Sequence, residues 1–173
     1  MKKMKFLKFL LLAVIVVSVY SCFDNDPIVD PINYTAARED ALLGEYLDTL
    51  MDRGYDIDTT DLGVYYSITK EGEGDFVQTR DSIGVNYQGY RPDNGRFFDA
   101  SAYNYADSIW KFTFTPGKLI SGFDDALMHL NKGAEGVFII PSDYAYGSSG
   151  SGDRSIPPYT TLVFIIKLED IYE

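Results

Sequence analysis

From Gly54 onward the apolar side chains of this chain repeat every second residue, whereas before Gly54 they repeat every three or four. A period of two is typical of strands with one buried face, and β-branched and aromatic residues are common in these stretches. One helical stretch, residues 122–131, stands among them. The pattern predicts an α+β domain over residues 60–173, an antiparallel sheet with one short helix packed on it. The predicted strands span residues 62–69, 83–87, 110–114, 136–140 and 161–168.

An amphipathic helix is predicted before the sheet, over residues 35–54. Leu43, Leu47 and Leu50 recur at spacings of three and four, and Gly54 stands where a C-terminal cap is expected. The apolar stripe would pack either on the domain that follows or on a second molecule. We favour the first, because a lone amphipathic helix is stabilised mainly by burying its stripe on its own core.

The composition excludes several kinds of chemistry. The chain has one cysteine, Cys22, and one histidine, His129, so it can form neither an internal disulfide framework nor a Cys/His zinc site. His129 stands beside leucines in the helical stretch, where a structural role is more common than catalysis. The net charge of −11 argues against nucleic acid, whose binding depends on lysine and arginine. We therefore expect no metal, no cofactor and no nucleic-acid partner.

The first 21 residues have the pattern of a secretory signal peptide. Four lysines among the first eight residues precede an apolar run over residues 9–17, as the basic and hydrophobic regions of such signals do. The run is shorter than the roughly 20 apolar residues that a membrane-spanning helix needs. We expect residues 1–21 to direct export.

Cys22 follows this segment, directly after the small residue Ser21, and resembles the lipidated cysteine of bacterial lipoproteins. The resemblance implies that acyl chains on Cys22 hold the protein to a membrane of the bacterial cell envelope. Residues 22–34 contain aspartates and prolines without periodicity, which is typical of a solvated tether. Phe23 after the cysteine favours the outer membrane over the inner, and both the periplasmic and the surface face stay open.

Five ordered blocks stand within residues 62–173: VNYQG (85–89), NGRFFDAS (94–101), LISGFDDAL (119–127), IPSDYAYG (140–147) and IPPYTTLVF (156–164). Together they resemble the FKBP family, the macrolide-binding peptidyl-prolyl cis-trans isomerases. The short blocks at residues 140–147 and 156–164 are the most specific of them. The resemblance implies a strongly bent antiparallel sheet that wraps one short helix, with an apolar pocket between the two.

The resemblance also implies roles for single residues. The Ile120 N–H and the Tyr146 hydroxyl would donate to ligand carbonyls, and the Asp99 carboxylate would lie at the pocket rim near the twisting amide. The alternative for each aromatic residue is ordinary core packing, which is the more common fate of a phenylalanine in a sheet. The implied substrate-binding residues are Tyr87, Phe98, Phe112, Leu119, Phe123, Ile156 and Phe164.

The implied reaction needs no nucleophile. An X-Pro amide rotates over a barrier of about 18–20 kcal/mol, and a catalyst has only to bind the twisted amide better than either planar form. The implied partners are proline-containing polypeptides and macrolide ligands, and the implied role is assistance to the folding of exported proteins. The alternative is a catalytically weak chaperone or proline-peptide binding module that keeps the pocket.

The chain departs from the family pattern at the pocket. The pocket floor, usually tryptophan in the best-known members, is Phe123, which offers less apolar area. The connection between Asp99 and Phe112 is longer and more aromatic than in compact members. Trp110 would take the role given to Phe112 if the register shifts by two, because both residues point to the same face of the strand.

Overall fold

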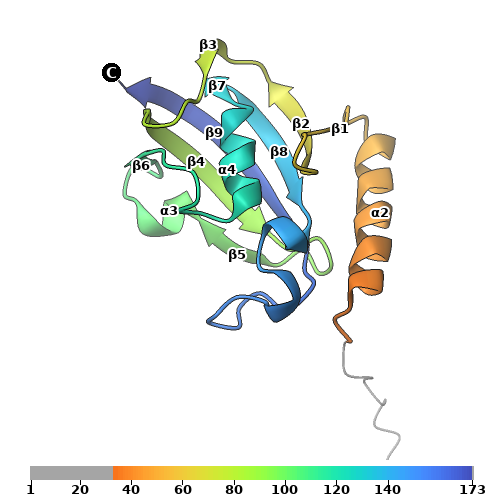
Figure 1. The fold of residues 1–173 in the computed structure, drawn as a ribbon. Coiled ribbons are helices and arrows are strands. Elements are labelled where there is room, and N and C mark those ends of the chain that lie inside the picture. Colours follow the sequence, from red (N-terminus) through yellow and green to blue (C-terminus); the bar gives the residue numbers. More distant parts are fainter. Residues whose placement is uncertain (1–32, 173) are drawn as a thin grey trace, which may run out of the picture. The chain divides into compact units, whose positions relative to one another are not determined.

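The computed structural model describes residues 33–172 (Figure 1), so the predicted signal peptide, Cys22 and most of the predicted tether lie outside the described residues. The strands are β1 (Asp58–Thr59), β2 (Tyr65–Lys70), β3 (Glu73–Phe76), β4 (Ser82–Tyr90), β5 (Phe97–Ala100), β6 (Trp110–Thr113), β7 (Asn131–Lys132), β8 (Glu135–Ile140) and β9 (Leu162–Tyr172). The helices are α2 (Ala36–Asp52), α3 (Ser101–Asn104), α4 (Ser121–Met128) and the 3-10 turns η1 (Ser142–Tyr144) and η2 (Gly147–Ser149).

One antiparallel sheet holds most of the strands, in the order β1-β2-β8-β9-β4-β5. Strand β6 also pairs with β4, beside residues 82–85, whereas β5 pairs with residues 88–90 of the same strand. The chain between β5 and β6, which includes α3, therefore leaves the sheet edge and returns to it. This split edge borders the pocket described below.

Helix α4 packs on one face of this sheet. Its Phe123, Ala126 and Leu127 are at most 4% exposed and belong to the main core cluster. A side chain at Gly122 has no room, because its Cβ would lie 2.3 Å from Cγ2 of Ile140 on β8. The glycine therefore sets how closely α4 approaches the sheet.

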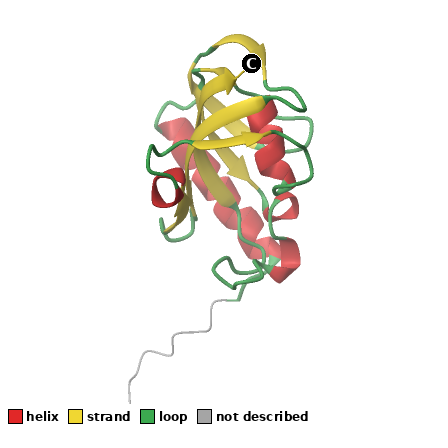
Figure 2. Cartoon of the chain, turned by 90° about the vertical axis from the view of Figure 1, so that its left-hand side faces the viewer, coloured by secondary structure: helices red, strands yellow, loops and turns green. Residues whose placement is uncertain are grey.

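Helix α2 covers the opposite face (Figure 1 and Figure 2). The side chains of β8 alternate: Val137 and Ile139 pack with Leu50 of α2 in a second core cluster, whereas Phe138 and Ile140 belong to the main one. Since alternate residues of a strand point to opposite faces, β8 is buried on both sides. The apolar stripe of α2 is thus covered by its own domain, which was the favoured expectation.

The ends of α2 follow from local sequence. Thr35 is the N-cap, and its hydroxyl accepts a hydrogen bond from the Arg38 N–H at 3.2 Å. At the other end Gly54 has φ of +89°, and the N–H groups of Gly54 and Tyr55 donate to the carbonyls of Met51 and Leu50. This is a Schellman motif, for which glycine is the preferred residue.

The predicted fold class is confirmed: an α+β domain in which a bent antiparallel sheet holds one short helix, preceded by an N-terminal helix. Among residues 33–172, no helix combines the length and the apolar character needed to cross a bilayer.

Candidate active site

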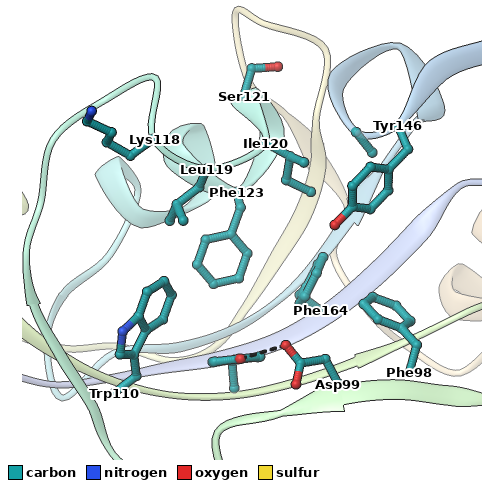
Figure 3. A pocket seen from close by; sticks show the side chains of 12 residues that line it. Phe98, Asp99, Trp110, Lys118, Leu119, Ile120, Ser121, Phe123, Tyr146 and Phe164 are labelled. Carbon is teal, nitrogen blue, oxygen red and sulfur yellow. Dashed lines mark hydrogen bonds between the residues drawn. The ribbon is translucent and has the colours of Figure 1, made fainter. Parts of the chain in front are cut away.

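A cavity of about 600 Å³ opens between α4 and the sheet, beside the split edge (Figure 3). Its walls come from segments far apart in the sequence, namely β4, β5, β6, the start of α4, the segment after η1 and β9. The lining residues are Tyr87, Phe98, Asp99, Trp110, Lys118, Leu119, Ile120, Ser121, Phe123, Ala145, Tyr146 and Phe164.

Aromatic rings form the inner surface of this pocket. Phe164 contacts Phe123 and Phe98 edge to face, with ring centroids 4.9 and 5.5 Å apart. Tyr87 meets Phe123 in the same way at 5.8 Å. Edge-to-face contacts between rings are favourable and restrict their orientation. The rings therefore hold one another in place and present an apolar surface to a ligand.

Gly89 on β4 allows two of these rings to come together. A Cβ at this position would lie 2.7 Å from Cζ of Phe98 and 2.8 Å from Cε1 of Phe164. Neither ring can yield without changing the shape of the pocket. Glycine at residue 89, part of the block at residues 85–89, is thus required by the aromatic walls.

Trp110, not Phe112, occupies the wall position of β6. Phe112 stacks behind the indole, with centroids 4.0 Å apart and an interplanar angle of 25°, and is absent from the pocket lining. Strand pairing gives the reason: Trp110 opposes Val85 on β4, whereas Phe112 opposes Ile83, which lies two residues farther from Tyr87 along β4. Trp110, the alternative that the sequence had left open, therefore takes the wall position implied for Phe112, and its role in binding stays a prediction.

Ile156 also lies outside the pocket lining. Its side chain is 2% exposed and packs in the main core. Its backbone N–H donates to the Ser151 hydroxyl at 2.9 Å, and its carbonyl accepts from the Ser151 N–H at 2.9 Å. Ile156 thus holds the base of the loop at residues 147–155 rather than contacting the cavity.

Asp99 lies at the rim with both carboxylate oxygens engaged. Oδ2 accepts a hydrogen bond from the Tyr87 hydroxyl at 2.7 Å (Figure 3), and Oδ1 accepts from the Ala100 N–H at 2.8 Å and the Asn104 side chain at 3.0 Å. Burial raises the pKa of Tyr87, and the hydrogen bond to Asp99 raises it further. Tyr87 is therefore a neutral donor that fixes the orientation of the carboxylate.

Among the hydrogen-bond donors of the pocket, the two that the family resemblance singled out have no acceptor within residues 33–172. One is the backbone N–H of Ile120, the residue that caps the N-terminus of α4. The other is the hydroxyl of Tyr146, a residue 39% exposed, which points into the cavity in Figure 3. Burial raises the pKa of Tyr146, as do the negative charges of Asp153 and Asp99, so the phenol stays protonated at neutral pH. Both donors are available to a ligand.

Three lining residues were not predicted: Lys118, Ser121 and Ala145. Lys118 directly precedes Leu119, and the other two lie inside blocks already identified, so their position beside predicted residues was the available signal. Asp124 supports this side of the pocket, because its carboxylate accepts a hydrogen bond from the Gly117 N–H at 2.6 Å. Burial raises the pKa of Asp124.

The described residues offer no group of three His, Cys, Asp or Glu side chains that could hold a metal ion. The pocket is a cavity with aromatic walls, one oriented carboxylate and free donors that include the Ile120 N–H and the Tyr146 hydroxyl. Such a site suits a ligand that carries carbonyl groups next to an apolar ring.

Comparisons with known proteins agree with this arrangement. Residues 73–169 match the family described as FKBP-type peptidyl-prolyl cis-trans isomerase. A Haemophilus influenzae protein named "Probable FKBP-type peptidyl-prolyl cis-trans isomerase" is 34% identical over 119 residues, 69% of this chain and 47% of the relative. The FK506-binding protein of Streptomyces anulatus is 35% identical over 98 residues, 57% of this chain and 77% of the relative.

Among solved structures, that of FkpA from Escherichia coli superposes with a TM-score of 0.66 and 30% sequence identity, over 79% of this chain and 60% of that one. This chain spans about half the length of the Haemophilus relative. The matched residues include β3 through most of β9 and hence every wall of the pocket. The chain belongs to the family of FKBP-type peptidyl-prolyl cis-trans isomerases.

Proposed function

We propose that this protein catalyses the cis/trans rotation of X-Pro peptide bonds in the pocket between α4 and the sheet. The observation that carries the proposal is the combination of aromatic walls with two donors that have no acceptor in the described part of the chain, the Ile120 N–H and the Tyr146 hydroxyl. A proline ring fits the aromatic surface, and the carbonyls on either side of it are acceptors for these donors.

Catalysis here requires only better binding of the twisted amide. Rotation breaks the resonance that gives the planar amide its barrier of about 18–20 kcal/mol. The carbonyl carbon then loses electron density from nitrogen, and the carboxylate of Asp99, already oriented by Tyr87, lies at the rim to stabilise it. Fixed donors and a fixed carboxylate in an apolar pocket need no reorganisation during the reaction. No covalent step is involved.

The test measures cis/trans exchange of short X-Pro peptides by NMR, with and without a macrolide competitor. We expect acceleration that the competitor abolishes, and a loss of about tenfold or more in the Asp99→Ala variant. Asp107→Ala is the matched control, because Asp107 is an exposed carboxylate paired with Lys111 outside the pocket. A folded wild-type protein that binds proline peptides without accelerating exchange would instead support a binding module. Phe123→Trp, which restores the usual floor, would then be the next variant.

We also propose that the protein assists the folding of exported, proline-containing polypeptides from a lipid anchor on Cys22. The support is the sequence: a signal-like segment over residues 1–21, a cysteine directly after it and an acidic tether. Phe23 favours the outer membrane of the envelope.

Fractionation of cells that express the Cys22→Ala variant tests the anchor. We expect the wild-type protein in the membrane fraction and the variant in the soluble fraction. Recovery of the variant in the membrane fraction at the wild-type level would contradict the proposal. Separation of inner from outer membranes on a density gradient then tests the assignment to the outer membrane.

A further inference from the structure

Glu39, in the first turn of α2, is a buried carboxylate far from the pocket in sequence. It is 8% exposed, and its oxygens accept three hydrogen bonds, from the Ser142 N–H at 2.7 Å, the Ser142 hydroxyl at 2.5 Å and the Thr161 hydroxyl at 2.8 Å. A buried carboxylate is costly unless such donors surround it. Both of its partners are themselves buried.

Both partners of Glu39 stand just before pocket residues. Ser142 begins η1, which leads within four residues to Tyr146, and Thr161 directly precedes β9, which carries Phe164. In Figure 1 the N-terminal end of α2 and the segment after β8 lie at the same end of the sheet. One side chain therefore joins the two segments that bring a donor and an aromatic wall to the pocket.

Few hydrogen bonds hold the segment that carries Tyr146, although Tyr144 and Ala145 pack against the main core and the Gly147 carbonyl accepts from the Tyr159 N–H at 2.9 Å. The Tyr144 carbonyl accepts from the Ser121 hydroxyl at 3.3 Å, and the Tyr144 and Ala145 N–H groups donate only within the turn, to Pro141 and Ser142. The Tyr146 side chain itself makes no hydrogen bond to residues 33–172. Together with this packing, the hydrogen bonds from Ser142 to Glu39 set where the segment, and with it the Tyr146 hydroxyl, lies.

We propose that Glu39 is a positioning residue of the pocket: through Ser142 and Thr161 it holds the 142–146 segment and the start of β9 in the geometry that binds the twisted amide. Helix α2, which precedes residues 73–169 matched by the family, thereby becomes part of the active domain. The inference rests on the proposed isomerase function.

Three variants of the full chain separate positioning from general stability. Glu39→Ala removes all three hydrogen bonds. Glu39→Gln keeps an oxygen that accepts from the Ser142 N–H and the Thr161 hydroxyl, and the Ser142 hydroxyl can turn to accept from the new amide. Leu43→Ala is the matched control, because it weakens the packing of α2 on the sheet without touching Ser142 or Thr161. Urea unfolding at the assay temperature checks that the wild-type protein and all three variants are folded there.

Under those conditions we expect kcat/KM for X-Pro exchange to fall about tenfold in Glu39→Ala, since small displacements of catalytic groups have effects of this size. Glu39→Gln should recover most of the loss, and Leu43→Ala should stay within about twofold of wild type. Equal losses in Glu39→Ala and Leu43→Ala would overturn the inference, because α2 would then act through stability alone.

A double-mutant cycle with Tyr146 tests the route of the effect. If Glu39 acts by positioning Tyr146, adding Glu39→Ala to the Tyr146→Phe variant should lower kcat/KM by no more than about twofold. If the loss of kcat/KM in the double variant equals the product of the losses in the two single variants, positioning through Tyr146 is contradicted.

Hydrogen exchange gives a readout that does not depend on activity. The Tyr144 and Ala145 amides, which bond within η1, should exchange faster in Glu39→Ala than in Leu43→Ala. A wild-type protein without isomerase activity would overturn the proposed function, and these exchange rates would still decide whether Glu39 holds the segment. Unchanged rates in Glu39→Ala would overturn the inference even in an active enzyme.

Discussion

Tyr146 and Asp99 are both polar groups of the pocket, but they differ in what they are free to do. The Asp99 carboxylate is held by Tyr87, Ala100 and Asn104, so its orientation is set before a ligand arrives. The Tyr146 hydroxyl has no acceptor within residues 33–172 and is free to donate to a ligand. A fixed acceptor and a free donor suit an enzyme that binds one conformation of an amide.

Tyr146→Phe should lower kcat/KM for X-Pro exchange by about tenfold, because the loss of one hydrogen bond worth about 1.4 kcal/mol corresponds to that factor. The free energy of unfolding should not change, because the hydroxyl makes no bond within the described fold. Tyr103→Phe, at a residue 74% exposed and outside the pocket lining, is the control and should leave activity intact. Equal activity of the wild type and Tyr146→Phe would remove Tyr146 from the site.

The pH profile gives a second test of the same residue. Burial raises the pKa of Tyr146 above the ordinary value of 10.0, so its neutral, donating form persists as the pH rises. The contribution of the hydroxyl should therefore be constant from pH 7 to about pH 9, and its loss should be centred above pH 10. A decline in the ratio of wild-type to Tyr146→Phe activity centred below pH 10 would contradict this assignment.

Trp110 is the single tryptophan of the chain and lines the pocket. Its fluorescence should therefore change when a proline peptide or a macrolide binds, and the change should saturate with ligand concentration. Trp110→Ala should raise KM more than Phe112→Ala does, because Phe112 lies behind the indole. A larger increase in KM for Phe112→Ala than for Trp110→Ala would show that Phe112, not Trp110, forms the wall that contacts the ligand.

At the scale of elements, two helices each contain one glycine, and the two glycines have opposite roles. Gly122 in α4 faces β8, where a Cβ would lie 2.3 Å from Cγ2 of Ile140, whereas Gly44 in α2 has nothing within 4 Å. The first glycine is required by packing between a helix and the sheet, and the second only weakens its helix.

Gly122→Ala should destabilise the fold by about 1–3 kcal/mol, since the core has to move to accept the methyl group. Gly44→Ala should stabilise it by roughly 0.5–1 kcal/mol, because alanine is the better helix former. Urea unfolding of both variants measures the two free energies. Similar effects in the two variants would show that α4 can shift away from β8 at little cost.

At the scale of the whole molecule, the net charge of −11 should select among substrates through long-range attraction. We expect kcat/KM at low salt to be higher for a peptide with lysine before proline than for one with glutamate there. The difference should shrink as salt is added, because the screening length falls from about 30 Å at 0.01 M to about 3 Å at 1 M. A peptide with alanine before proline is the control, and its kcat/KM should change little as salt is added. A preference that does not change with salt would point to direct contacts instead.

The longest strands and both main helices could be predicted from the sequence. The predicted strand at residues 161–168 overlaps β9 from Leu162 onward, and the predicted helix at residues 35–54 corresponds to α2, because hydrophobic period and capping residues are local properties. The short strands β1, β3, β5 and β7 were not predicted. Each contains two to four residues, too few for a periodic signal, and β1, β3 and β7 have no buried position.

For the site, the aromatic residues at positions 87, 98, 123 and 164 line the pocket as the family resemblance implied, together with Asp99, Leu119, Ile120 and Tyr146. Their catalytic and binding roles are predictions that the experiments above test. Phe112 and Ile156 were placed in the lining by the same resemblance and lie outside it. The error at Phe112 has a specific cause, since the length of the connection after Asp99 does not fix the register of β6 on β4.

The sequence by itself determined the alternation of buried and exposed residues, the caps of α2 and the blocks that identify the family, because each depends on residues close together in the chain. Only the tertiary structure decided that Trp110 replaces Phe112 in the wall and that Glu39 joins Ser142 to Thr161. The physical reason is that strand register and buried hydrogen bonds join segments up to 122 residues apart. Such contacts form only when the sheet closes around α4 and α2 covers its other face.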